Sequence, residues 1–364
     1  MRNGFWNLAA GAFLCFCLLT ACAGENGGKS TEPTGSARPP ATSGTADPTP
    51  SVGAISPDAP SPTDAPEEVV ASVPQCTIFA FEKYFMALRE DGTVALLGEP
   101  GENSDFYEEY SERVGKWTDI VSLCESNEVP AAITKEGRIV VAAADSFEEE
   151  LERYMPEAVS WVGLEIVATL EYLKDADPVV WAKVNYPYNC ITIDSEGTLV
   201  ESRNGKLDVV RGASVVAADY DYFLDCYGKL HFRKSDGTSE VLEEESRFVS
   251  IAGYPVRTDG TVRTGSYITA IQNWTGLASI CESRDGGLYV GLKRNGTVVA
   301  CAGGVSEDPY GNYAVEEWRD VVEVTTNGYY TVGKTSDGRL LCTEIPPEAG
   351  VSFTKEGVEA LLQK

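Results

Sequence analysis

The side chains of this protein that are best suited to acid–base or metal-binding chemistry are 56 carboxylates, ten cysteines and one histidine. A serine- or cysteine-based hydrolase needs an imidazole as its base, so such a site could be built only through His231. His231 stands at a single strand position in the hairpin Lys229-Leu-His231-Phe, where a lone histidine is more often structural. The sequence has no phosphate-binding glycine loop, no dinucleotide-binding glycine motif and no His-Glu-x-x-His zinc motif. We therefore expect no catalytic residue, no cofactor and no metal site, and we do not expect an enzyme.

The cysteines fall into two groups. Three lie within the first 22 residues, and seven are spread over the rest of the chain: Cys76, Cys124, Cys190, Cys226, Cys281, Cys301 and Cys342. The chain contains no Cys-x-x-Cys pair, which argues against a zinc site. An odd number of cysteines among apolar segments predicts buried free thiols, with one or two disulfides as the alternative in an oxidising compartment.

Residues 1–21 have the pattern of a bacterial export signal. Arg2 is followed by an apolar run from Phe5 to Leu19, which is too short for a comfortable transmembrane span. The run ends in Leu19-Thr-Ala-Cys22, which resembles the bacterial lipobox, the motif whose cysteine is acylated and becomes the mature N-terminus. The resemblance implies that Cys22 is lipidated and that the protein is extracytoplasmic, held to a bacterial membrane by this anchor alone. An ordinary signal peptide is the alternative.

Residues 22–72 are expected to be a disordered tether. Ten of the nineteen prolines lie between Pro33 and Pro74, among serine, threonine, alanine and glycine. Such a segment buries too little apolar surface to offset its chain entropy. As a coil, about fifty residues would span roughly 40 Å. The tether would hold the globular part, residues 73–364, away from the membrane.

The globular part is built on a repeated hairpin. Apolar and polar residues alternate on both sides of Asn295-Gly296, which is typical of two short strands joined by a tight turn. Related hairpins surround six further glycines, and the seven in order are Gly92, Gly137, Gly197, Gly228, Gly260, Gly296 and Gly338. Their successive spacings are 45, 60, 31, 32, 36 and 42 residues. A β-unit repeated at such intervals predicts an all-β propeller, because one unit cannot bury its own apolar face.

A tryptophan motif recurs between the hairpins. Good copies are Trp117-Thr-Asp-Ile-Val, Trp274-Thr-Gly-Leu-Ala and Trp318-Arg-Asp-Val-Val, and Trp161-Val-Gly-Leu is a looser one. Motif and hairpin together resemble the repeats of the regulator-of-chromosome-condensation family. The resemblance covers about residues 73–345 and implies a seven-bladed β-propeller. Units three to five lack the tryptophan, so six or eight blades stay open as alternatives.

Three links between a hairpin and the next tryptophan are long, acidic and aromatic. They are residues 99–116, 144–160 and 304–317, and their aromatic residues are Phe106, Tyr107, Tyr110, Phe147, Tyr154, Tyr310 and Tyr313. Equivalent loops of a propeller emerge on the same face. Tyrosines offer flat contact area at low entropic cost, so we predict that these loops bind a partner.

The formal net charge of −27 bears on the kind of partner. So acidic a surface repels phosphate backbones, and we expect no nucleic-acid partner. We expect a monomeric, lipid-anchored interaction module whose partner is an envelope protein or a cell-wall component. Two alternatives stay open: binding of cell-wall carbohydrate or peptidoglycan through the tyrosines, and a carboxylate-dependent hydrolase, for which no spacing singles out a pair of acids.

Within the family, the eukaryotic members act on a nuclear GTPase and chromatin, roles that export and acidity argue against. A secreted bacterial propeller with similar repeats, which inhibits β-lactamases through loops on one face, is the nearer analogy.

Overall fold

The computed structural model describes residues from Val70 onward, with gaps. The described ranges are 70–81, 83–98, 110–126, 129–142, 177–185, 189–203, 206–219, 221–234, 238–264, 269–283, 287–302, 311 and 313–363. The chain divides into two compact units, Met1–Pro62 and Thr63–Lys364, and every described residue lies in the second. The predicted export signal, Cys22 and nearly all of the predicted tether lie outside the described residues. Among the described residues, no helix is both long enough and apolar enough to cross a membrane.

The described strands form seven sheets, numbered here in chain order. Sheet 1 contains β1 (Ile78–Phe81), β2 (Tyr84–Leu88) and β3 (Val94–Gly98), and sheet 2 contains β4 (Ile120–Leu123), β6 (Ala131–Thr134) and β7 (Ile139–Val141). Sheet 3 has the order β11 (Lys206–Val210), β10 (Leu199–Arg203), β9 (Asn189–Asp194), β8 (Val179–Asn185) and β5 (Glu125–Ser126). Sheet 4 contains β12 (Val215–Ala218), β13 (Tyr222–Asp225), β14 (Leu230–Arg233) and β15 (Ser239–Leu242).

The last three sheets are smaller. Sheet 5 contains β16 (Phe248–Ser250) and β17 (Val256–Arg257), sheet 6 contains β18 (Leu277–Glu282), β19 (Leu288–Lys293) and β20 (Val298–Ala302), and sheet 7 contains β21 (Val321–Thr326), β22 (Thr331–Thr335) and β23 (Leu340–Cys342). A 3-10 helix, η1 (Pro347–Ala349), and a short helix, α4 (Lys355–Ala360), follow sheet 7. All strand pairs within the sheets are antiparallel except β5 with β8, which is parallel.

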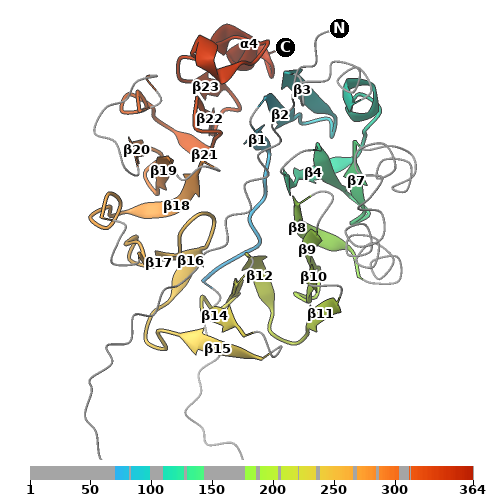
Figure 1. Cartoon of the computed structure of the whole chain (residues 1–364), viewed down its shortest axis with the longest axis vertical. Helices are drawn as coiled ribbons and strands as arrows, with labels where there is room; N and C mark the ends of the chain where they lie inside the picture. Colours follow the sequence, from blue (N-terminus) through green and yellow to red (C-terminus); the bar gives the residue numbers. More distant parts are fainter. Residues whose placement is uncertain are drawn as a thin grey trace, which may run out of the picture. The chain divides into compact units, whose positions relative to one another are not determined.

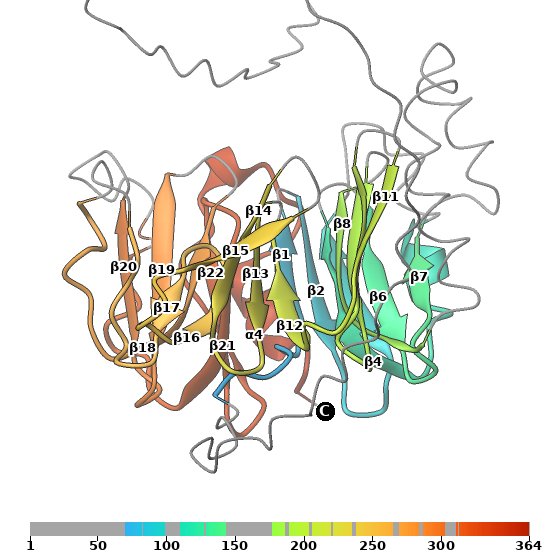
Figure 2. The same ribbon diagram turned by 90° about the horizontal axis from the view of Figure 1, so that it is seen from below.

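The sheets surround a common centre, as expected of a β-propeller. Figure 1 shows them one after another around this centre, with the first strand of each sheet nearest to it, and Figure 2 shows the same sheets from the side. β1 of the first sheet contacts β21 of the last. Apolar clusters fill the spaces between neighbours, for example Trp181 and Ile193 of sheet 3 with Phe223 of sheet 4. The chain is therefore an all-β propeller. The blade count stays a prediction, because residues 143–176 lie outside the described residues.

The seven hairpin turns lie where the sequence predicts them. All seven turn glycines have a positive φ, between 74° and 84°, a region in which a Cβ atom clashes with the backbone. In six cases the glycine carbonyl accepts a hydrogen bond of 2.8–3.1 Å from the first strand of the next sheet. The acceptor–donor pairs are Gly92–Ile120, Gly137–Val179, Gly197–Val215, Gly228–Phe248, Gly260–Leu277 and Gly296–Val321. Six of the seven hairpin turns therefore also join their sheet to the next one.

The tryptophan motif has a structural explanation. Its third residue directly precedes the first strand and has a left-handed conformation, with φ of 57° at both Asp119 and Asp320 and 70° at Gly276. Aspartate and glycine tolerate this conformation better than most residues. In two of the motifs the tryptophan ring packs against a glycine in the second strand. A Cβ atom would lie 2.9 Å from the Trp274 ring at Gly291 and 2.9 Å from the Trp318 ring at Gly333.

The first strands carry a feature that was not predicted, a β-bulge at one common position. In six sheets the pairing with the second strand skips one residue, and the skipped residues are Val121, Val180, Val216, Val249, Ala278 and Val322. A bulge bends a strand and increases its local twist. Val121 and Val322 are 40% and 56% exposed, respectively.

The propeller begins earlier than the predicted boundary at residue 73. The backbone N–H groups of Val70 and Ala71 donate to the carbonyl of Cys226 in sheet 4, at 2.9 and 3.1 Å. Ala71 is 5% exposed and belongs to an apolar cluster of sheet 4. The polar and proline-rich surroundings of residues 70–72 predict a tether, but Ala71 is small enough to pack against the sheet. These residues therefore belong to the propeller.

Candidate functional site

The two ends of the propeller differ in their connections. We call the end with the seven hairpin turns the turn end, and the opposite end the loop end. β3 ends at Gly98, β7 at Val141 and β20 at Ala302, each at the loop end of its sheet. The three acidic links therefore start from the loop end.

The three acidic links and the hairpin turns differ strongly in charge. The three links together contain 16 acidic and three basic residues. The seven five-residue segments that begin three residues before each turn glycine together contain eight acidic and eight basic residues. The links thus carry much of the net charge of −27, whereas the turns are balanced. A segment that carries many charges of one sign creates a field that attracts an oppositely charged partner.

Most of the predicted partner-binding side chains cannot be placed. Phe106, Tyr107, Phe147, Tyr154 and Tyr310 lie outside the described residues, as does the predicted lipidation site Cys22. Their assignment stays a prediction.

Tyr110 has a different position from the one expected of a binding residue. Residues 110–114 are helical, and the side chain of Tyr110 is only 6% exposed. It packs with Val114 and Trp117 in the apolar cluster shared by sheets 1 to 3. The spacing of these three residues, four and then three positions, places them on one face of a helical turn. This apolar face was a signal in the sequence that could have predicted the burial, and the Tyr110 ring is not presented to a partner.

Tyr313 is half-buried at the end of the third link. It packs against the cluster that contains Val315 and Trp318 of the tryptophan motif. The C-terminal ends of the first and third links are therefore anchored in the core by a tyrosine.

Polar groups gather on first strands near the centre. The ammonium group of Lys183 in β8 lies 3.0 Å from a carboxylate oxygen of Asp219 and 3.4 Å from one of Glu125. Glu125 lies in β5, which leaves sheet 2 and adds to the inner edge of sheet 3. The three side chains are 26–41% exposed, so the ion pairs join sheets 2, 3 and 4 at modest strength.

Glu323 of β21 forms a polar connection between the last and first sheets. Its Oε1 accepts from the backbone N–H of Thr77 at 2.7 Å and of Ile78 at 3.1 Å, and its Oε2 accepts from the Thr77 hydroxyl. Lys334 donates to the same hydroxyl at 3.0 Å. Burial raises the pKa of the Glu323 carboxyl, although these hydrogen bonds lower it in part. The group is tied to the backbone of sheet 1.

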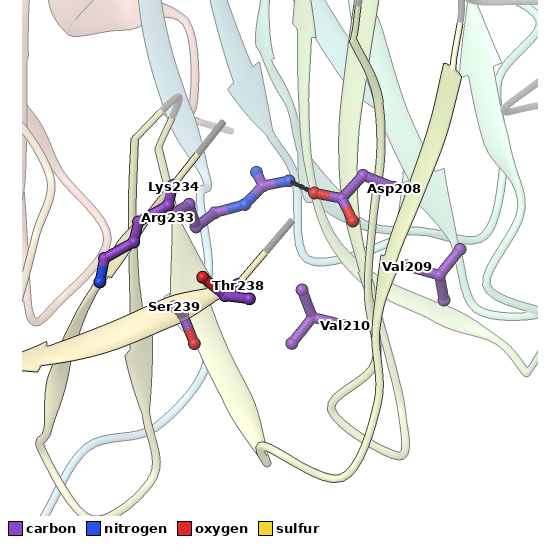
Figure 3. A pocket seen from close by; sticks show the side chains of 7 residues that line it. All are labelled: Asp208, Val209, Val210, Arg233, Lys234, Thr238 and Ser239. Carbon is purple, nitrogen blue, oxygen red and sulfur yellow. Dashed lines mark hydrogen bonds and ion pairs between the residues drawn. The ribbon is translucent and has the colours of Figure 1, made fainter. Parts of the chain in front are cut away.

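A cavity of about 210 Å³ lies between sheets 3 and 4. Figure 3 shows Arg233 of β14 reaching across it to Asp208 of β11. The Arg233 guanidinium also pairs with Glu201 of β10, whose side chain is fully buried. Lys234, at the cavity's rim, pairs with Glu240 at 2.6 Å. The cations that line the cavity are thus paired with carboxylates of this chain, and the cluster joins two sheets.

His231 has the structural environment that the sequence favours. Its Nε2 lies 2.9 Å from Oδ2 of Asp225, and its ring stacks on Phe223 at a centroid distance of 4.4 Å. Asp225 also accepts from the backbone N–H groups of Tyr227 and Lys229 in the turn of sheet 4. The imidazole therefore supports a hairpin turn.

The seven cysteines of the propeller are free thiols. Three are buried and four are half-buried. Burial raises the pKa of Cys190, Cys281 and Cys342 to about 12. Among the described residues, no group of three or more histidine, cysteine, aspartate or glutamate side chains could hold a metal ion.

Two features of these sites were not predicted from the sequence, the Arg233 cluster and the Glu323 connection. Arg233 and Glu201 are 32 positions apart, and Glu323 and Thr77 are 246 apart. Single charged residues at such separations follow no periodic pattern. No spacing in the sequence could have singled them out.

This chain is similar to known proteins in structure, but no match was found at the level of sequence families or curated sequences. No protein-family model matches the chain, and no curated protein sequence matches it. The β-propeller domain of Myceliophteria thermophila Cps50 (Swd1) is similar over 72% of this chain and 95% of its own, with 12% identity and a TM-score of 0.40. Yeast RCC1 (Prp20) bound to Kap60 is similar over 81% and 72%, with 12% identity and a TM-score of 0.33. The computationally designed Ika8 protein is similar over 73% of this chain and 82% of its own, with 13% identity and a TM-score of 0.39. The evidence that this chain is a propeller is the arrangement of its seven described sheets around a common centre (Figure 1).

Proposed function

We propose that this protein is an extracytoplasmic interaction module that binds a protein partner through its loop end. The observation that carries the proposal is the separation of charge between the acidic links, which start from the loop end, and the balanced hairpin turns. Charge gathered in this way contributes more to the rate and specificity of association than to affinity alone. The partner would be a protein of the cell envelope, and it would present a basic surface to the acidic links.

The point where the chain enters the propeller fits this arrangement. Val70 contacts Cys226, which belongs to a hairpin turn, so the tether joins the propeller at the turn end. With Cys22 lipidated, the link to the membrane would reach the turn end and leave the loop end accessible. We propose a lipid-anchored, extracytoplasmic location on this basis. We also propose that the protein is not an enzyme, since Glu323 and Glu201 are bound to donors of this chain.

Charge neutralisation tests the loop-end proposal. One variant carries Glu102→Gln, Asp105→Asn and Glu108→Gln in the first link, and its matched control carries Glu90→Gln, Glu136→Gln and Glu196→Gln at three hairpin turns. Cross-linking in the native envelope should capture a partner with the wild type and the control and much less of it with the link variant. Capture by the wild type should weaken as salt rises, because salt screens exposed charges. Equal capture by both variants would rule out the acidic links as the contact.

The anchor is tested separately. Cys22→Ser should release the protein from the membrane fraction, because a second signal for membrane attachment is not expected. Metabolic labelling with a fatty acid should mark the wild type and not the variant. A variant that stays in the membrane fraction would contradict the lipid anchor and leave the loop-end proposal untouched.

A further inference from the structure

The segment before the first strand runs across the propeller. Figure 1 shows the chain approaching from beside β12, crossing the centre of the ring of sheets and continuing into β1. Residues 70–77, which we call the strap, contact sheets 2, 4 and 7 before the chain enters sheet 1. Sheets 1 and 4 lie on opposite sides of the ring, so the strap ties opposite sides together.

The strap's first end is attached to sheet 4. Two backbone N–H groups, of Val70 and Ala71, share the single carbonyl of Cys226. Ala71 packs into the cluster that contains Val216, Phe248 and half-buried Cys226. Half-buried Val73 packs on the same cluster and on the cluster between sheets 3 and 4, and the Val70 side chain lies against Gly228. The two backbone donors share one acceptor, so this end is held mainly by apolar packing.

The second end is attached more extensively. The Gln75 amide donates to the bulged Val121 carbonyl at 2.8 Å, and the Cys76 carbonyl accepts from the Leu123 N–H at 2.7 Å. Thr77 is bound through its N–H and hydroxyl to Glu323. This end therefore has backbone and side-chain bonds to both neighbours of sheet 1.

We propose that residues 70–77 are a two-ended strap that detaches from sheet 4 while its other end stays bound to sheets 2 and 7. The difference between the two attachments carries the proposal. The chain upstream joins at Val70, so a pull or a competing contact from that side acts first on the weaker end. Detachment uncovers the apolar cluster of Val216 and Phe248 at the turn end.

Thiol labelling with mass spectrometry tests the proposal in the full chain. Ala71→Asp places a carboxylate in the apolar cluster, and Ser72→Asp, at the adjacent exposed position, is the matched control. In Ala71→Asp, labelling of Cys226 should rise about tenfold or more, because an uncompensated buried charge shifts an opening equilibrium by at least that factor. Labelling of Cys76 and of Cys342, which is buried in sheet 7, should stay at the wild-type rate. The control should match the wild type throughout.

The other end is tested by Glu323→Ala. Labelling of Cys76 should then rise while that of Cys226 stays unchanged. If Cys76, Cys226 and Cys342 all rise together in Ala71→Asp, the strap does not detach independently. If none rises, sheet 4 does not hold it through Ala71. Either result overturns the proposal.

Hydrogen exchange of the wild type gives a measurement that needs no variant. The amides of Val70 and Ala71 should exchange at least about tenfold faster than those of Thr77 and Leu123, because the local opening is less costly there. Equal protection of all four amides would contradict a two-ended strap.

Discussion

At the scale of single residues, the backbone conformation of a few positions accounts for the repeat. Gly260 in a hairpin turn and Gly276 in a tryptophan motif both have positive φ, 81° and 70°. They also lie against each other, since a Cβ atom at Gly260 would be 2.7 Å from the Gly276 Cα. The glycine of one hairpin is thus required both by its own turn and by the approach of the next sheet.

The two requirements can be separated with a pair of variants. Gly338 has a φ of 84° but nothing within 4 Å of its would-be Cβ, because no sheet follows it in the described chain. Gly338→Ala should cost about 1–2 kcal/mol of unfolding free energy, the usual penalty of a left-handed non-glycine residue. Gly260→Ala should cost more, about 3 kcal/mol or above, since backbone atoms must also move. Urea denaturation would measure both, and equal losses would show that the close approach adds nothing.

At the scale of elements, ion pairs join sheets 3 and 4 in addition to the hairpin-turn hydrogen bond between Gly197 and Val215. Arg233, 5% exposed, connects β14 with β10 and β11. Its two carboxylate partners differ in burial, since Glu201 is fully buried and Asp208 is about one-third exposed. The buried partner determines the effect of removing the arginine.

Arg233→Ala should destabilise the protein by about 3–5 kcal/mol, because it leaves the buried Glu201 carboxylate without its guanidinium. Lys234→Ala is the matched control, since its pair with Glu240 is 42% and 49% exposed. The control should cost no more than about 1 kcal/mol. Chemical denaturation of both variants decides the matter. A loss of under 1 kcal/mol in Arg233→Ala would mean that the cluster is not a structural join.

At the scale of the whole molecule, the contact between the last and first sheets includes the Glu323 carboxyl. The folded protein holds the Glu323 proton more tightly than the unfolded chain does, because burial raises its pKa above 4.5. A raised pKa of an acid adds stability at low pH, and this contribution is lost as pH rises through the folded-state value. The ionised carboxylate is thus the less favoured form at this junction.

Glu323→Gln removes this dependence while keeping an oxygen that can accept from Thr77 and Ile78. The unfolding free energy of the wild type minus that of the variant should therefore fall as pH rises from about 4.5 to about 7. Other groups titrate equally in both proteins and cancel in the difference. Denaturation curves at a series of pH values would measure it, and a difference that rises with pH would contradict the raised pKa.

Local patterns in the sequence predicted the repeat unit well. The period of two, the turn glycines and the aspartate or glycine after each tryptophan all depend on backbone preferences within a few residues, so the sequence shows them directly. The same information could not predict the bulges on the first strands. A bulge depends on the pairing register between two strands.

By itself, the sequence determined an all-β propeller with seven hairpins and acidic links, because these features depend on neighbours in the chain. Tertiary structure alone decided which distant residues meet, such as Thr77 with Glu323, Arg233 with Glu201, and Ala71 with the cluster around Val216. It also decided that Tyr110 packs inward, although the apolar spacing around it was visible. The physical reason is that a contact between residues far apart in the sequence depends on where whole sheets lie, and one position along the chain carries no periodic signal of it.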